Sequence, residues 1–194
     1  MSSSATAARA DGTGTAAAEA TKSLRALYYV RFGFALVWAA LMAVLAGTLG
    51  PAVIVLLVLY PLFDMAAAVL DFRSSGAGRP KAPLYVNMGL SLLTAAGLVV
   101  AIPVGIPGVL RVWGAWAITA GLVQLLVAIL RYRLGGQWPM ILSGGISTIA
   151  GAGFVLMADG PDASLGSIAG YALLGGIFFL LSALRLHRLA VRAS

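Results

Sequence analysis

Six long apolar segments, separated by short polar or glycine- and proline-rich stretches, dominate the hydrophobic pattern of the chain. A transmembrane helix requires about 20 predominantly apolar residues. Runs of this length occupy roughly residues 27–48, 52–72, 83–102, 108–130, 138–157 and 165–186. The connections "GTLGP", "PVGIPG" and "DGPDAS" contain the Gly and Pro residues typical of tight turns. The pattern therefore predicts an all-α integral membrane protein with six transmembrane helices.

Composition supports this class and removes several kinds of chemistry. Hydrophobic residues make up 61% of the chain and charged residues 10%, whereas a soluble domain is usually about 45–50% apolar and about 25% charged. The chain has no cysteine, which excludes disulfides, thiolate metal sites and cysteine nucleophiles, and its only histidine is His187. The sequence also contains no metal-binding cluster, nucleotide-binding loop or nucleophile–base pair, so we expect no metal, no cofactor and no enzymatic activity.

The two ends of the chain differ from the six-helix part. Residues 1–24 are rich in Ala, Ser, Thr and Gly, a composition typical of disorder. We therefore predict a disordered cytoplasmic tail over residues 1–24, a membrane domain over 25–188 and a cytoplasmic C-terminal tail over 189–194. More spans follow the first apolar run, so we expect it to be an uncleaved helix and not a signal peptide.

The basic residues indicate how the helices are oriented. With six spans, nearly all of them fall on one side of the membrane, and the loops of the opposite side carry Asp159 and Asp162, with Arg111 as the exception. The positive-inside rule then predicts that both termini are cytoplasmic and that the protein lies in the plasma membrane. The residues that set this orientation are Lys22, Arg25, Arg31, Arg73, Arg79, Lys81, Arg131, Arg133, Arg185, Arg188 and Arg192.

The distribution of basic residues also indicates which binding partners to expect. A net charge of +7 in a soluble protein would raise the question of nucleic acid, but here the charges stand at the ends of apolar runs and form no patch. We expect the lipid bilayer as the surroundings, a second copy or another membrane protein as partner, and no nucleic acid.

The six spans also look paired. The second, fourth and sixth end in "VLDFR", "ILRYR" and "ALRLHR", and each has an aromatic residue near its middle or start: Tyr60, Trp116 and Tyr171. Each pair crosses the membrane, turns tightly and returns to a basic end. We therefore predict three parallel two-helix hairpin repeats, related by rotation about the membrane normal.

Several of these segments resemble a known family. The stretch "WAITAGLVQLLVAILRYRLGGQWPMILSGGISTIAGAGFVL", the segment "YVRFGFALVWAALMAVLAG", the motif "YPLFD" and the segment "GYALLGGIFFLLSALRLHR" are similar to the short-repeat membrane family that includes the HdeD acid-resistance membrane protein. The resemblance covers about residues 27–188. It implies six helices and a link to acid or envelope stress, and it implies no catalytic residues. The Ala-rich N-terminus and Pro61 depart from the family pattern.

Asp64 is the principal candidate for a functional site. It lies inside the second span, where a carboxylate is unfavourable unless a partner compensates its charge. Arg31 enters the neighbouring helix from the same end, so an Arg31–Asp64 ion pair would join the two helices. Two alternatives are a polar cavity with Asp64 in its wall, used in transport or pH sensing, and a bond to Tyr60 one turn away. Asn87 and Gln124 are the other polar residues predicted to join a cluster with Arg31 and Asp64.

Small residues in the last two spans predict close helix packing. Ser143, Ser147 and Gly151 are spaced four apart, and Gly166 and Gly170 form a GxxxG motif.

A serine-protease interpretation of "GIST" with His187 fails, because Ser147 lies about 13 Å above the boundary at which His187 stands, and a serine needs its base within about 3.2 Å. Aromatic residues near span ends, including Trp38 and Trp113, are expected to form an interfacial belt.

Three functions are open at this point. The first is a non-enzymatic inner-membrane protein that supports acid or envelope stress tolerance, which the family resemblance implies. The second is a small transporter or channel with a polar site around Asp64 and Gln124. The third is an intramembrane scaffold or assembly partner that uses the small-residue helices.

Overall fold

The computed structural model describes residues 2–74, 81–130, 132–134 and 138–193, and over these residues it consists of helices and their connections. Six of the helices are long and apolar enough to cross a membrane, which confirms the predicted number of helices of this kind. The elements are α1 (Ser2–Leu45), α2 (Pro51–Ser74), α3 (Ala82–Ala101), η1 (Ile102–Val104), α4 (Ile106–Leu130), η2 (Tyr132–Leu134), α5 (Trp138–Met157) and α6 (Gly166–Ala193).

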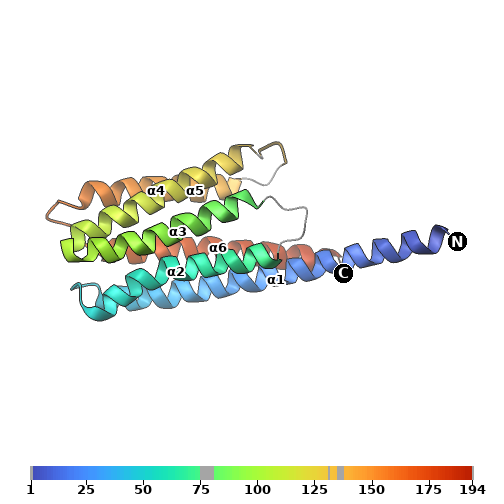
Figure 1. Ribbon diagram of the computed structural model, residues 1–194, viewed down its shortest axis with the longest axis horizontal. Helices are drawn as coiled ribbons and strands as arrows, with labels where there is room; N and C mark the ends of the chain where they lie inside the picture. The colour runs from blue at the N-terminus through green and yellow to red at the C-terminus, as the bar shows by residue number, and fades with distance from the viewer. Residues whose placement is uncertain (1, 75–80, 131, 135–137, 194) are drawn as a thin grey trace.

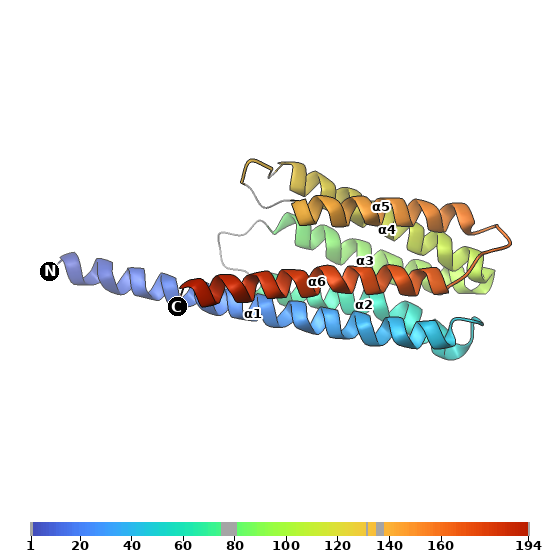
Figure 2. The same ribbon diagram turned by 180° about the vertical axis from the view of Figure 1, so that it is seen from behind.

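The helices form one antiparallel bundle with both termini at the same end (Figure 1). We call this the basic end, because the helix ends there carry Arg25, Arg73, Lys81, Arg133 and Arg185. Arg79 and Arg131 lie outside the described residues. At the opposite end, tight connections join α1 to α2, α3 to α4 and α5 to α6 (Figures 1 and 2). One of them requires glycine, because Gly105 has a φ of 88° where η1 gives way to α4.

Arg111, the basic residue that departs from the charge pattern, forms an ion pair with Asp159. Arg111, at the opposite end, donates hydrogen bonds of 2.5 Å to both carboxylate oxygens of Asp159. The two side chains are 47% and 71% exposed, so the pair contributes little to stability. Its effect is to neutralise the positive charge of Arg111 locally.

Helix α1 begins at Ser2, so helix also covers residues 2–24, where we expected disorder from the sequence. This segment is rich in alanine, the strongest helix former, and it continues directly into the membrane-crossing part, Thr21–Leu45, so it needs no separate nucleation. At the other terminus α6 continues to Ala193, and its membrane-crossing part ends at Arg188.

The six helices form a ring in which close and loose contacts alternate. The closest pairs are α4 with α5, α1 with α6 and α2 with α3, whereas α5 and α6 contact each other least. Glycines permit the α4–α5 approach: a Cβ on Gly121 would lie 2.7 Å from the Gly144 carbonyl oxygen, and one on Gly151 would lie 2.6 Å from that of Gly114. Helix α6 approaches α1 at Gly176, where a Cβ would lie 2.9 Å from the Cβ of Ala35.

The half of the bundle towards the opposite end is tightly filled. Trp38 and Trp113 are almost fully buried there, so the expectation that they belong to an interfacial belt is wrong. Trp38 donates a hydrogen bond of 2.7 Å to the Leu56 carbonyl and so joins α1 to α2. Indole rings are large enough to fill the centre of a six-helix bundle. The fully buried side chains that complete this core include Met42, Leu57, Leu98, Leu110, Leu165 and Ile168.

Candidate functional site

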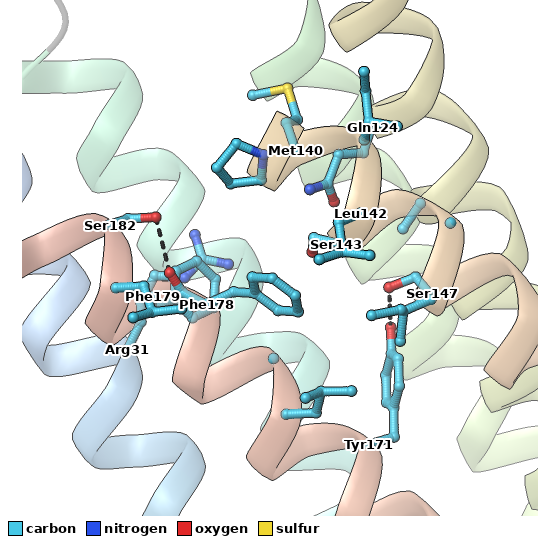
Figure 3. A pocket seen from close by; sticks show the side chains of 18 of the residues that line it. Arg31, Gln124, Met140, Leu142, Ser143, Ser147, Tyr171, Phe178, Phe179 and Ser182 are labelled. Carbon is cyan, nitrogen blue, oxygen red and sulfur yellow. Dashed lines mark hydrogen bonds between the residues drawn. The ribbon is translucent and has the colours of Figure 1, made fainter. Parts of the chain in front are cut away.

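A cavity of about 1040 Å³ lies in the half of the bundle nearer the basic end, and we call it the central cavity. All six helices contribute to its wall, and α5 and α6 contribute most of it. Figure 3 shows Gln124, Ser143 and Ser147 across the pocket from Arg31, Phe178 and Phe179. The volume is at the upper end of the range of about 300–1,000 Å³ that is usual for small-ligand pockets.

The most polar part of this wall is built around Asp64. Arg31 of α1 donates a hydrogen bond to Asp64 Oδ1 and forms an ion pair with it. Asn87 and Ser91, one turn apart on α3, donate hydrogen bonds of 2.7 and 2.8 Å to Oδ2. We call these four residues the Asp64 cluster. Both carboxylate oxygens are therefore satisfied, and three helices are joined at one charge.

The guanidinium of Arg31 is held from a second direction. Its Cζ lies 4.1 Å from the centroid of the Phe179 ring on α6, within the range of a cation–π contact. The side chains of Arg31 and Asp64 are only 15% and 12% exposed. Arg31 thus occupies the space between a carboxylate and an aromatic face, which is where a cationic ligand of Asp64 would otherwise bind.

Asp64 combines two features that the sequence offered as alternatives, an ion pair with Arg31 and a position in the wall of a cavity. Asp64 pairs with Arg31 on the adjoining helix, and both side chains line the central cavity. The proposed bond between Asp64 and Tyr60 is absent from the hydrogen bonds of the described residues. Instead, the Tyr60 ring packs against Trp38, Trp113 and Trp116, with centroid distances of 4.8, 5.4 and 6.0 Å.

Gln124 is not part of the Asp64 cluster, although we predicted that it would be. It lies on the α4 wall of the cavity, and its amide makes no hydrogen bond within the described part of the chain. Sequence analysis missed Ser91, the fourth member of the cluster. The signal was present, because Asn87 and Ser91 are four residues apart and so share one face of a helix.

The other predicted residues divide between the cavity and the helix contacts. Gly151 packs against α4, as the small-residue pattern predicted. Ser143 and Ser147 line the cavity, and the Ser147 and Tyr171 hydroxyls form a hydrogen bond of 3.1 Å. Gly166 and Gly170 are exposed, and a Cβ on Gly170 would meet nothing within 4 Å, so this motif does not pack helices within the chain. The packing surface of α6 lies around Gly176 instead.

The cavity is closed towards the opposite end of the bundle. Tyr60, Trp116 and Tyr171 line its deep part, and beyond them lies the core that contains Trp38 and Trp113. At the near end, Trp138 and Arg185 line the cavity where α5 begins and α6 leaves the membrane-crossing region. The cavity therefore ends at this core, and within the described residues it does not continue through the bundle.

Within the described part of the chain, His187 and the Ser147 hydroxyl do not hydrogen-bond with each other. No group of three or more His, Asp or Glu side chains among the described residues could hold a metal ion. His187 stands at the basic end, where its Nδ1 accepts a hydrogen bond of 3.2 Å from Arg25, and Ser147 bonds with Tyr171 instead. The central cavity thus has aromatic walls and contains one largely buried ion pair.

Comparisons with known protein families, with curated proteins and with solved structures find no match to this chain.

Proposed function

We propose that this multi-pass protein is a small transporter whose substrate enters the central cavity from the cytoplasm or from the cytoplasmic leaflet. The proposal places both termini and the basic end in the cytoplasm of a plasma-membrane protein, as the positive-inside rule favours. A single observation carries it: a pocket of about 1040 Å³ opens in one half of the bundle, and a tightly packed core closes the other half. This is the form expected of one end state of alternating access.

The proposal assigns a specific part to the Asp64 cluster. Its ion pair joins α1 and α2, its amide and hydroxyl donors come from α3, and the Arg31 guanidinium contacts α6 through Phe179. A ligand that contacts Arg31 or Asp64 would change the balance among these four helices. Intramembrane ionisable residues of this kind commonly mark substrate pathways.

The absence of cysteine from the sequence allows a direct test. In a Ser147→Cys variant the thiol stands in the cavity wall beside Tyr171, and it is the only thiol in the protein. A membrane-impermeant thiol reagent should label it from the basic side in inside-out vesicles. If the protein alternates its access, the reagent should also label it, more slowly, from the other side in right-side-out vesicles.

The controls for this labelling experiment are on the same helix and in the same cluster. Gly153→Cys lies on the exposed surface of α5, away from the cavity, and its thiol should stay unlabelled in lipid. Asp64→Asn, introduced beside Ser147→Cys, should change the ratio of labelling from the two sides. Labelling from the basic side alone, with no effect of Asp64→Asn, would contradict transport.

We also propose three parallel hairpin repeats as the architecture behind this site. Two observations support the proposal. Close and loose helix contacts alternate around the ring, and the three aromatic residues near the middle or start of the second, fourth and sixth spans, Tyr60, Trp116 and Tyr171, all line the central cavity. Rotation about the axis of the bundle would bring such equivalent positions together at its centre.

A second candidate function is tolerance of acid or envelope stress without enzymatic activity. The resemblance of "YPLFD" and "ILSGGIS" to the HdeD-containing family supports it. Deletion of the gene in its host should lower survival at low pH or under membrane-damaging conditions, and re-expression of the intact protein should restore it. Unchanged survival of the deletion strain under both conditions would count against this role.

A further inference from the structure

The central cavity changes character along its length. On α6 its lining extends from Tyr171 to Arg185, fourteen positions apart, which on an α-helix corresponds to about 21 Å. Polar side chains, including Gln124 and Arg185, lie towards the basic end. The deeper part is formed by Trp116, Ile149 and other apolar or aromatic side chains. The chains of one lipid leaflet occupy about half of a hydrocarbon core that is about 30 Å thick, so the pocket is long enough for one acyl chain.

The charged residues of the cavity wall favour an anion. They are Arg31, Asp64 and Arg185, and the one acidic residue among them, Asp64, is already paired with Arg31. The Asp64 carboxylate already accepts hydrogen bonds from three side chains. An arriving cation would have to displace Arg31 from both Asp64 and Phe179, because Arg31 fills the space between them.

Additional hydrogen-bonding groups remain available on the facing wall. Gln124 and Ser143 line the cavity, and neither side chain makes a hydrogen bond within the described part of the chain. Figure 3 shows both across the pocket from Arg31. An amide and a hydroxyl at this position can donate to the oxygens of a headgroup.

The pocket also borders the surface that faces lipid. Helices α5 and α6 contact each other least of all neighbours in the ring, and they lie on the same face of the bundle (Figure 2). Leu142, Ile149 and Leu181 line the cavity and are 57%, 75% and 55% exposed. An apolar chain can therefore enter between α5 and α6 on the basic side of the Ser147–Tyr171 hydrogen bond.

From these observations we infer that the substrate is a single-chain amphiphile with an anionic headgroup, of the long-chain carboxylate class. Its headgroup would lie near Arg31, Arg185 and Gln124, and its chain would extend along α5 and α6 towards Tyr171. A lipid of the cytoplasmic leaflet has this same orientation, with its headgroup at the basic end, so the molecule enters without turning over. The inference rests on the proposed transport function and names its substrate class.

The test uses purified full-length protein in nanodiscs and dibromostearate, a fatty acid whose bromines quench nearby tryptophan fluorescence. Trp138 lines the near end of the cavity but is 67% exposed at the surface of the bundle, so it is replaced by phenylalanine in every variant. Trp116 then remains as the tryptophan of the cavity wall. At alkaline pH, where the carboxyl group is ionised, we expect saturable quenching. Stearate should displace the probe at a concentration about tenfold lower than octadecyltrimethylammonium, which has the same chain and the opposite charge.

Two glycines of α6 provide a matched pair of variants. A Cβ on Gly175 or on Gly170 would meet nothing within 4 Å, but only Gly175 lines the cavity. Gly175→Leu should abolish the saturable part of the quenching, whereas Gly170→Leu should leave it unchanged. Gln124→Leu should weaken stearate binding about tenfold, as expected for loss of one hydrogen bond to a charged group.

The outcomes separate the substrate class from the function. Stronger displacement by the cation than by stearate, or equal effects of Gly175→Leu and Gly170→Leu, would overturn the inferred substrate class. If Ser147→Cys is then still labelled from both sides of the membrane, transport stands and only the substrate class falls. If labelling occurs from the basic side alone while stearate binds as expected, the amphiphile site stands and transport falls.

Discussion

Replacement of Arg31 by leucine is expected to destabilise the protein by about 3–5 kcal/mol, the usual effect of removing one partner from a buried ion pair. The two side chains are only 15% and 12% exposed, so water that reaches Asp64 through the cavity would compensate the lost guanidinium only in part. Asn87 and Ser91 would continue to donate to Oδ2, but neither carries a positive charge. Denaturant unfolding of the purified protein in mixed micelles, followed by helical circular dichroism, measures this loss.

The double variant Arg31→Leu/Asp64→Leu separates the ion pair from simple loss of packing. With both charges removed, no uncompensated charge stays buried, and we expect the double variant to be more stable than Arg31→Leu alone. The exposed Arg111–Asp159 pair is the matched control, because it is also an arginine–aspartate contact, here between α4 and the connection that follows α5. Arg111→Leu should change the unfolding free energy by less than about 1 kcal/mol. Equal losses for Arg31→Leu and Arg111→Leu would contradict a compensating role for the buried pair.

The number and order of the helices in the bundle could be predicted from local features of the sequence. These features are apolar runs of spanning length, tight glycine–proline connections and charges at the ends of the runs. They are local, so they do not depend on how the helices pack against one another. The pairing of Arg31 with Asp64 could be predicted for the same reason. The two residues enter from one end on consecutive antiparallel helices, and a carboxylate at that depth needs a cation.

The contacts that were predicted wrongly depend on which face each helix turns toward its neighbours. Gln124 and Asp64 lie at similar depth, but depth alone does not say which side of α4 faces α2. The same limit applies to the small residues of α6. The GxxxG motif of Gly166 and Gly170 is more conspicuous in the sequence than Gly176, yet Gly176 is the one that meets α1. The cavity, as a space left between rotated helices, has no local signature at all.

Trp38 and Trp113 illustrate a different ambiguity. Tryptophan is enriched at membrane interfaces because one edge of the ring is polar and the rest is apolar. A buried indole can also fill a core with its large ring. Trp38 does so and donates to the Leu56 carbonyl, whereas the Nε1 atoms of Trp113 and Trp116 are buried without a hydrogen-bond partner among the described residues. Which outcome occurs depends on whether the neighbouring helices leave a space large enough for the ring at the centre of the bundle, and this is set by tertiary structure.

The sequence contains a signal for the α4–α5 interface that our prediction did not use. Gly114 and Gly121 are seven residues apart on α4, and Gly144 and Gly151 are seven apart on α5. Seven residues are close to two helical turns, so each pair lies on one face. The two faces meet in antiparallel order, with Gly114 against Gly151 and Gly121 against Gly144. This is the closest interface of the bundle, and it forms the framework on which the α4 and α5 walls of the cavity are held.

Gly151→Ala should therefore destabilise the protein by about 1–3 kcal/mol, the usual effect of overpacking a well-packed contact. The added Cβ would lie 2.6 Å from the Gly114 carbonyl oxygen and 2.8 Å from the Ile118 backbone nitrogen. Neither is the end of a flexible side chain, so the helices themselves must separate. The matched control is Gly153→Ala on the same helix, where a Cβ meets nothing within 4 Å. It should be neutral or more stable by about 0.5–1 kcal/mol, because alanine favours helix over glycine.

Denaturant unfolding in mixed micelles compares the two alanine variants directly, and their difference in unfolding free energy cancels the common gain in helix propensity. The same pair also tests whether the interface sets the shape of the cavity. Separation of α4 from α5 moves the wall that carries Gln124 and Ser143, so Gly151→Ala should also change the rate at which Ser147→Cys is labelled, and Gly153→Ala should not. Equal unfolding free energies for the two variants would show that the backbone contact between Gly114 and Gly151 is not what holds these helices together.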